Sequence, residues 1–289
     1  MRNTLILAAA LFASSLVSVA APLVQNGQTV AFLGDSITEQ GAATPGGYVR
    51  LVASGLAANG IEIKVVPAGI SGHKSDQMLA RLERDVLSKK PDWMTLSCGV
   101  NDVWHGEKGV ALEDYKKNVT AIVDRCQKAG VKVLVLTATQ IKLPVDNPNN
   151  IKLAAYNAFL RDLAKERSLP LADLNADMVA TQDALKAAGI KRVLTGDGVH
   201  MNIYGNLMMA KGVLKGFGLT DAQVATSEAK WQKIPETVQI QTVAKVKLSL
   251  AELAALEAEA AKKEVTVDAL IGDKAAAAIK ASLATSSSK

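Results

Sequence analysis

Short apolar segments alternate with helical patterns from Thr29 to Phe217, and this alternation constrains the fold more than any other feature. The apolar segments are nearly continuous, which is typical of strands covered on both faces. We expect strands at Thr29–Leu33, Ile61–Val66, Trp93–Ser97, Val131–Thr137 and Leu169–Asp173. We expect helices at Gly47–Ala58, Ser75–Leu87, Leu112–Lys128, Ile151–Arg167 and Met178–Ala187. This order predicts βαβ units and a parallel α/β sheet with right-handed crossovers.

Polar, glycine-rich turns follow the first three expected strands, and a fourth turn follows the last crossover. They are Gly34–Thr38, Pro67–Gly72, Cys98–Asp102 and Gly196–His200. In a parallel α/β sheet, ligands bind at the edge formed by the carboxyl ends of the strands. We therefore expect the polar residues of these turns to converge at one edge of the sheet.

Ser36, His200 and Asp197 form a candidate set for nucleophilic catalysis. A serine hydroxyl becomes a good nucleophile only when a base removes its proton. His200 supplies an imidazole base, and Asp197 is close enough in sequence to orient the ring. An acyl-transfer intermediate also needs N–H donors for its oxyanion. The backbone N–H groups of Ser36 and Gly72 and the side-chain amide of Asn101 are the candidate donors.

These residues fall in four blocks whose order resembles the SGNH hydrolases, also called the GDSL esterase/lipase family. The blocks are Gly34-Asp35-Ser36-Ile37-Thr38, Gly72, Gly99-Val100-Asn101-Asp102 and Asp197-Gly198-Val199-His200. Four blocks in order are far more specific than Gly-Asp-Ser alone. The resemblance covers residues 30–217. It implies a flavodoxin-like three-layer α/β/α sandwich that needs no metal or organic cofactor.

The resemblance also implies a role for each site residue. Ser36 is the nucleophile, His200 the base and Asp197 its partner, while Ser36, Gly72 and Asn101 form the oxyanion hole. These assignments agree with the roles that the residue types suggest on chemical grounds.

One position departs from the family's pattern, and four further residues are candidates for substrate contacts. The second block often begins with Asn, but Pro67 stands near that place, so we expect a local change of backbone with the chemistry retained. The candidate contacts are Asp35, His73, Trp104 and His105. Two alternatives stay open: Asp35 only braces the nucleophile turn, and the two histidines are ordinary rim residues.

The expected substrate follows from the strand-end loops, which are short and polar. They contain no aromatic or Leu-rich insertion that would form a large acyl pocket. This favours a small acyl group on a polar carrier, and exported family members of this appearance are similar to carbohydrate O-acetyl esterases. We expect an exported serine esterase that hydrolyses acetyl esters on a glycan. The alternatives are a broad lysophospholipase or arylesterase and, from another class, a non-catalytic glycan-binding module.

Residues 1–20 are typical of a secretory signal peptide. Arg2 gives the positive start, Leu5–Leu16 is apolar, and Ser18-Val19-Ala20 supplies small residues for cleavage before Ala21. The alternative is a membrane anchor, but the apolar segment is shorter than the roughly 20 residues that span a bilayer. We expect export to the periplasm or the medium, without stable membrane insertion.

The charge, cysteine and histidine content bears on nucleic-acid binding, disulfide formation and metal binding. Lys and Arg number 33 against 28 Asp and Glu, and this formal charge of +5 is too small and scattered to predict a nucleic-acid partner. We expect Cys98 and Cys126 to be buried free thiols, although export would permit a disulfide. No His or Cys has a partner at metal-ligand spacing, so no metal site is predicted.

The strand–helix alternation ends after Phe217, and the remainder is predicted to be a separate extension. The predicted parts of the mature chain are a hydrolase domain at 21–219, a linker or strap at 220–243, a mainly helical extension at 244–285 and a disordered tail at 286–289.

Within the extension, a strand at Lys245–Leu248 precedes a helix at Leu250–Lys263, capped by Ser249, and a second helix from Thr266 to Ala281. This order resembles the ribbon-helix-helix fold, whose members pair by strand exchange, so we expect homo-oligomerisation through the extension. The alternative is an Ala-rich helical appendage.

Overall fold

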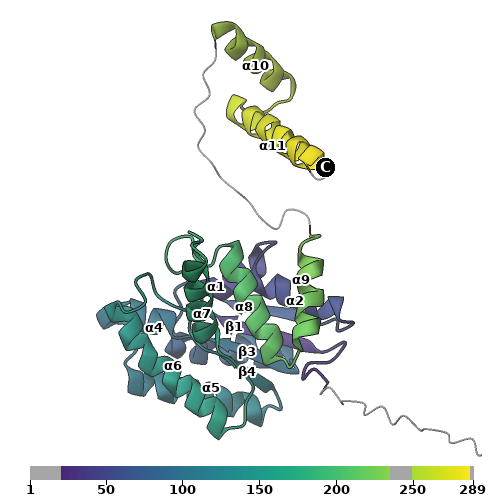
Figure 1. Ribbon diagram of the computed structural model, residues 1–289. Helices are drawn as coiled ribbons and strands as arrows, with labels where there is room; N and C mark the ends of the chain where they lie inside the picture. The colour runs from purple at the N-terminus through teal and green to yellow at the C-terminus, as the bar shows by residue number, and fades with distance from the viewer. Residues whose placement is uncertain (1–20, 235–248, 287–289) are drawn as a thin grey trace, which may run out of the picture. The chain divides into compact units, whose positions relative to one another are not determined.

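The computed structural model describes residues 21–234 and 249–286. The chain divides between residues 239 and 240 into two compact units, which are described separately. In the first unit, five parallel strands form one sheet in the order β2-β1-β3-β4-β5 (Figure 1). The strands are β1 (Thr29–Gly34), β2 (Lys64–Gly69), β3 (Trp93–Ser97), β4 (Lys132–Leu136) and β5 (Leu171–Ala172). This is the flavodoxin-like order, as predicted.

Helices cover both faces of this sheet. They are α1 (Ser36–Ala43), α2 (Tyr48–Ala58), α3 (Ser75–Asp85), α4 (Val100–Trp104), α5 (Leu112–Lys128), α6 (Pro148–Glu166), α7 (Leu174–Ala187), α8 (Ile203–Gly216) and α9 (Asp221–Trp231). Helices α1, α2, α8 and α9 form one contacting group, and α3, α5 and α6 form another (Figure 1). Right-handed crossovers in opposite directions from β1 place the groups on opposite faces. The result is the three-layer α/β/α sandwich.

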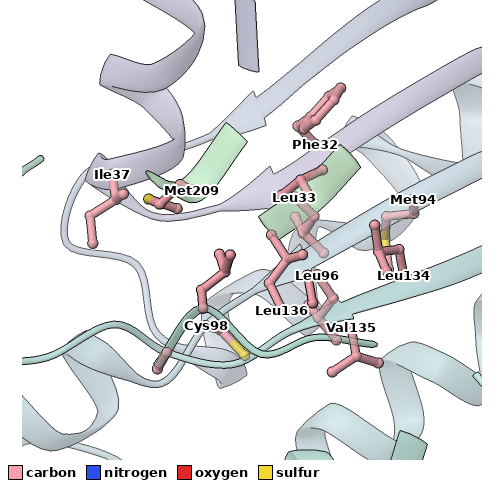
Figure 2. Packing of buried hydrophobic residues seen from close by; sticks show 14 of the residues in the cluster. Phe32, Leu33, Ile37, Met94, Leu96, Cys98, Leu134, Val135, Leu136 and Met209 are labelled. Atoms are coloured by element: carbon pink, nitrogen blue, oxygen red, sulfur yellow. The ribbon is translucent and has the colours of Figure 1, made fainter. Parts of the chain in front are cut away.

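The core lies between the sheet and its two helical layers. Figure 2 shows side chains of β1, β3 and β4, among them Phe32, Leu96 and Leu134, packed together. Trp93 meets Phe217 edge-on, with ring centroids 5.5 Å apart. All five residues of β3 are buried, which explains why this strand reads as a continuous apolar segment.

Strand β2 differs because it lies at the edge of the sheet. It begins at Lys64, three residues later than predicted, because its only neighbour is β1 and pairing starts at Thr29. An edge strand tolerates proline, which lacks the N–H that a second neighbour would require. Pro67 sits opposite Phe32 in an unbroken ladder, so the local change of backbone that we expected at Pro67 is not seen.

Cys98 and Cys126 are both free and buried, as predicted. The Cys126 thiol lies 3.7 Å from the sulfur of Met94, and burial raises its pKa to about 12. A thiol held in its neutral form is a poor nucleophile, so Cys126 acts as an apolar packing residue.

The stretch predicted as a linker or strap begins with a helix that belongs to the first unit. Thr220 caps α9 in a capping box with Gln223, and α9 packs on α2. The Ser227 hydroxyl donates to the carbonyl of Gly55 at 2.9 Å, and the buried indole of Trp231 donates to the carbonyl of Leu51 at 2.9 Å. The predicted boundary after residue 219 therefore falls inside one packed unit, because apolar residues of α9 complete its core.

The second unit contains α10 (Leu250–Lys262) and α11 (Val267–Ser286). Ser249 caps α10, as predicted, and the two helices are joined by an ion pair of 2.8 Å between Lys274 and Glu259. Ser286 still belongs to α11, although we predicted a disordered tail from that residue. The predicted strand Lys245–Leu248 and the predicted signal peptide lie outside the described residues, so both remain predictions, as does the ribbon-helix-helix resemblance.

None of the helices in the described parts of the two units is both long enough and apolar enough to cross a bilayer.

Candidate active site

Ser36 is the first residue of α1 and directly follows the end of β1. The Asp35 carboxylate caps this helix by accepting from the backbone N–H of Ile37 at 3.0 Å. The turn is so tight that a Cβ on Gly34 would collide with the side chain of Thr38. Ser36 is consequently held at a helix N-terminus, where backbone N–H groups lack intrahelical partners and the helix dipole favours negative charge.

The structure brings Ser36, His200 and Asp197 together. His200 Nε2 lies 2.9 Å from Ser36 Oγ, and His200 Nδ1 lies 2.6 Å from Asp197 Oδ2. The other carboxylate oxygen of Asp197 accepts from the backbone N–H groups of Val199 and His200, at 2.9 and 2.8 Å. The carboxylate thus fixes both the ring and the backbone of His200, while the free ring nitrogen faces the serine hydroxyl.

The loop that carries Asp197 and His200 is closed on itself. Thr195 and Met201 form an antiparallel bridge, and the N–H of Gly196 donates to the carbonyl of His200 at 2.9 Å. Burial alone would raise the pKa of Asp197. The hydrogen bonds from the ring and backbone of His200 and from the backbone of Val199 outweigh it and lower the pKa to about 2. Asp197 is therefore a stable anion that supports a positive charge on the imidazole.

Gly72 lies on the turn after β2, in a left-handed conformation with φ of +76°. A Cβ would meet nothing there, so the backbone angle, and not space, requires glycine. The turn is held by Glu39, whose carboxylate accepts from both the N–H and the hydroxyl of Ser71. Among the described residues, no acceptor faces the N–H of Gly72.

Asn101 lies in the first turn of α4 and reaches toward both neighbouring elements. Its side-chain amide donates to the carbonyl of His73 at 3.2 Å and to Asp35 Oδ2 at 3.4 Å. The amide therefore sits between the Gly72–His73 turn and the Asp35–Ser36 turn. Asn101 thus links the two turns that carry the other predicted oxyanion donors, Ser36 and Gly72.

Two buried carboxyl groups lie behind these donors. Asp102 Oδ1 accepts from the N–H and the hydroxyl of Ser75, at 3.0 and 2.6 Å, while its Oδ2 has no partner among the described residues. The pKa of Asp35 is raised to about 6, chiefly by burial. The charge of Asp102 also raises this pKa, whereas the hydrogen bond from the Ile37 N–H lowers it. Burial also raises the pKa of Asp102.

The four candidates for substrate contact lie in different surroundings. Asp35 is buried and its oxygens bond to protein groups, which favours the bracing role. His105 is exposed at the end of α4. Trp104 is half-buried, and the ammonium of Lys142 lies over its ring, 4.8 Å from the centroid, in a cation–π contact. His73 is half-buried beside Gly72, and its Nδ1 accepts from Nε of Arg81 at 3.1 Å.

Arg81 and Glu39 were not singled out from the sequence, although both contact the Ile70–His73 turn. The burial of Arg81 could have been predicted from the sequence, because Arg81 lies between Met78 and Leu82 on the buried face of α3. A charged residue on the apolar face of a helix needs hydrogen-bonding partners inside the fold. The identity of those partners depends on how α3 packs, which no local pattern specifies.

Comparison with known proteins agrees with this geometry. Residues 32–207 match the sequence model of the GDSL-like lipase/acylhydrolase family. The chain belongs to this family. It is accordingly a carboxylic ester hydrolase, and its five-stranded parallel sheet is the family's α/β fold.

Two relatives with similar sequences are described as esterases. The chain is 29% identical to an acetylxylan esterase of Geobacillus stearothermophilus, over 68% of this chain and 96% of that protein. It is 30% identical to esterase TesA of Pseudomonas aeruginosa, over 60% of this chain and 79% of TesA.

Acetylxylan esterases are also found among the solved structures that resemble this chain. A crystal structure of an acetylxylan esterase from G. stearothermophilus matches with a TM-score of 0.61, over 68% of this chain and 97% of that one, at 29% identity. The acetyl xylan esterase AlAXEase matches with a TM-score of 0.60, over 65% of this chain and 98% of that one, at 34% identity.

Proposed function

We propose that this enzyme hydrolyses small acyl esters, acetyl esters above all, on carbohydrate through an acyl-enzyme formed on Ser36. The observation that carries the proposal is the continuous chain of contacts from Ser36 Oγ through His200 to Asp197, at 2.9 and 2.6 Å. The arrangement of the predicted oxyanion donors supports the proposal, because the Asn101 amide bridges the Asp35–Ser36 turn and the Gly72–His73 turn. Nucleophile, base, orienting group and oxyanion donors are the set that acyl transfer requires.

In the acylation step, Ser36 Oγ attacks the ester carbonyl while His200 Nε2 takes the hydroxyl proton. The positive charge that forms on the imidazole is stabilised by Asp197. The carbonyl oxygen becomes an oxyanion and is held by the N–H groups of Ser36 and Gly72 and the amide of Asn101. His200 then gives its proton to the leaving alcohol, and the acyl group stays on Ser36.

In the deacylation step, the same groups act on water. His200 takes a proton from a water molecule, whose oxygen attacks the acyl-enzyme carbonyl. The same N–H donors hold the second oxyanion. Its collapse releases the carboxylic acid, and His200 returns the proton to Ser36 Oγ, which restores the resting site.

The choice of acetylated carbohydrate rests on two observations. Three of the matches that align over nearly their whole length are described as acetylxylan esterases. The strand-end loops are polar, and the cation of Lys142 over Trp104 adds a polar edge near Asn101. A broad lysophospholipase or arylesterase remains the alternative, and a non-catalytic glycan-binding module is disfavoured because none of the required groups is missing.

The experiment that tests this function is Ser36→Ala, assayed with p-nitrophenyl acetate and by acetate release from acetylated xylan. Loss of both activities with an unchanged circular-dichroism spectrum is the expected result, because the variant lacks the attacking atom. Unchanged turnover would remove Ser36 from the mechanism. Faster hydrolysis of long-chain esters than of acetylated glycans by the unaltered enzyme would favour the alternative.

We also propose export of the enzyme, cofactor-free activity and homo-oligomerisation through residues 244–285. Export rests on residues 1–20 and is tested by N-terminal sequencing of the secreted protein, which should begin at Ala21. Activity should persist after treatment with EDTA. Oligomerisation is tested by sedimentation of the full chain beside a chain ending after Ile234, which keeps α9 and its Trp231. Equal oligomeric states would exclude the extension as the assembly element.

A further inference from the structure

Arg81 is a buried cation that makes no contact with the candidate triad. It comes from α3 and is 5% exposed. Its charge is partly balanced by Asp85 at 3.1 Å, one turn further along the helix. Burying a guanidinium costs free energy unless its N–H donors find acceptors. The acceptors of Arg81 therefore indicate its structural role.

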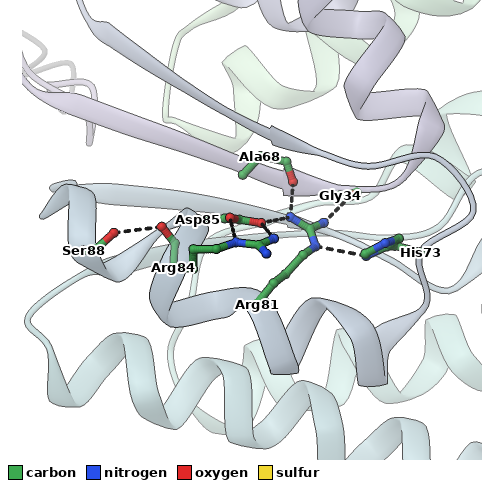
Figure 3. Close-up of polar contacts among 7 residues, drawn as sticks. All are labelled: Gly34, Ala68, His73, Arg81, Arg84, Asp85 and Ser88. Carbon is green, nitrogen blue, oxygen red and sulfur yellow. Dashed lines mark hydrogen bonds and ion pairs between the residues drawn. The ribbon is translucent and has the colours of Figure 1, made fainter.

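The remaining donors of Arg81 reach three separate segments (Figure 3). Nη2 donates to the carbonyl of Gly34 at 2.8 Å, and Nη1 donates to the carbonyl of Ala68 at 2.8 Å. Nε donates to Nδ1 of His73 at 3.1 Å. One planar group therefore joins the end of β1, the end of β2 and the turn that follows β2.

Two of these segments lead directly to the proposed backbone oxyanion donors, Ser36 and Gly72. Gly34 precedes the Asp35–Ser36 turn, and His73 directly follows Gly72. The carbonyl of His73 also accepts from the Asn101 amide at 3.2 Å. A shift of the His73 residue would therefore move the Gly72 N–H and release the Asn101 amide together.

We infer that Arg81 is a positioning residue of the esterase reaction, which holds the His73 ring and thereby aligns the oxyanion donors of Gly72 and Asn101 with Ser36. The inference rests on the proposed function. Arg81 acts through His73 and the backbone, and it does not touch the ester. Because Nδ1 of His73 accepts from Arg81, the ring is neutral with its proton on Nε2, and burial and the charge of Arg81 lower the pKa of His73 in the same sense.

The principal test is Arg81→Lys with p-nitrophenyl acetate as substrate. Lysine keeps a positive charge near Asp85 but loses the planar fork that reaches two carbonyls and a ring together. Because small misplacement of catalytic groups costs on the order of 100-fold, we expect kcat to fall by that factor with KM within about twofold of the original. A trifluoromethyl ketone, which forms a tetrahedral adduct with the serine, should bind more weakly in proportion to the loss in kcat.

The matched control is Arg84→Lys. Arg84 lies on the same helix and binds the same Asp85, at 2.6 Å, but its side chain is 72% exposed and reaches no part of the site (Figure 3). Its kcat and inhibitor affinity should equal those of the unaltered enzyme. Loss of activity in Arg84→Lys equal to that in Arg81→Lys would overturn the inference, since a general disturbance of α3 or of its Asp85 ion pairs would then suffice to explain both.

A double-mutant cycle with His73→Ala separates positioning from general stability. If Arg81 acts through His73, each single variant should lose kcat and the double variant should lose little more than either one. Additive losses would contradict the inference. If Arg81→Lys does not fold, His73→Ala alone decides, and unchanged kcat there would refute the role.

The outcome is separable from the proposed function. An active Ser36→Ala enzyme would refute the proposed function itself. An inactive Ser36→Ala enzyme together with a fully active Arg81→Lys enzyme would refute only the positioning role.

Discussion

The two aspartates of the candidate site, Asp35 and Asp197, are held in opposite surroundings. Asp35 lies in the buried turn between β1 and α1, and its pKa is raised to about 6 chiefly by burial. The Asp197 side chain is 59% exposed on the closed loop before α8, and although burial raises its pKa, the hydrogen bonds from His200 and Val199 bring it to about 2. One region is built by burial and the other by local hydrogen bonding.

This difference separates two tasks that a hydrolase site must perform. The proposed nucleophile and oxyanion donors must not move, and the turns that carry them are tied together by buried groups such as Arg81 and Asp35. The base must take up and release a proton, and the ring of His200, with its side chain 34% exposed, stays near solvent. We expect substitutions in the exposed region to act chiefly on the rate, with only a small effect on stability, and those in the buried region to act on both rate and stability.

The largest expected effect is that of His200→Ala in the exposed region. Removing the base from a serine triad leaves only binding and oxyanion stabilisation, so kcat should fall by about 10⁶-fold. Because the ring is partly exposed, the thermal midpoint should stay within about 2 °C, since surface substitutions change stability little. Kinetics with p-nitrophenyl acetate and thermal unfolding check both parts, and a large loss of stability would contradict the proposed division.

A smaller loss is expected for Asp197→Asn. An asparagine oxygen still accepts from the backbone N–H groups of Val199 and His200, but its amide would face His200 Nδ1 and favour the wrong tautomer. We expect kcat to fall by about 10³-fold, less than for His200→Ala, because water reaches this exposed position. An equal or greater loss than that of His200→Ala would show that Asp197 does more than orient the ring.

The exposed region is also the one that sequence predicts best. Asp197 and His200 are close in the chain, so one closed loop brings them together. The parallel sheet followed from the apolar strands in the same way. Local patterns suffice wherever the interacting groups are neighbours in sequence.

In the buried region the contacts that tie the turns together escaped prediction, because they join segments that are distant in the sequence. Arg81 donates to the carbonyl of Gly34, 47 positions away, and backbone carbonyls leave no mark in a sequence. Likewise, α9 was expected to be a linker or strap, although Trp231 bonds to Leu51 across 180 positions. Such partners become visible only when the packing of helices on the sheet is known.

Within the buried region, Asp35→Asn should raise stability and lower activity. A buried carboxyl whose folded pKa is about 6, against roughly 3.9 when unfolded, contributes most to stability below about pH 4 and loses that contribution as pH rises through 6. Asparagine is neutral at every pH, so at pH 8 the variant should be more stable by about 2 kcal/mol. At pH 4 the difference should vanish. Urea unfolding at both pH values measures it, and a destabilised variant at pH 8 would contradict the argument.

The same substitution should reduce kcat by about 10-fold. Asp35 Oδ2 accepts from the Asn101 amide, whereas an asparagine amide placed there would repel it. Misdirecting one oxyanion donor costs less than removing it, which typically costs 10²-fold or more. Steady-state kinetics at pH 8 checks this, and unchanged kcat would assign Asp35 to stability alone.

The smallest effect is expected from Asp197 in acid. Its folded pKa of about 2 lies below the unfolded value, so its stabilising contribution is complete above about pH 4 and is lost as pH falls from 4 to 2. Because the side chain is largely exposed, solvent screening limits that contribution to less than about 1 kcal/mol. Other carboxylates titrate in the same range, so the measurement is a difference: thermal midpoints at pH 5 and pH 3 for the unaltered enzyme and for Asp197→Asn. The unaltered enzyme should lose slightly more stability between the two pH values. Equal pH dependence of the thermal midpoint in the unaltered enzyme and in Asp197→Asn would show that the Asp197–His200 contact stabilises only the imidazolium formed during catalysis.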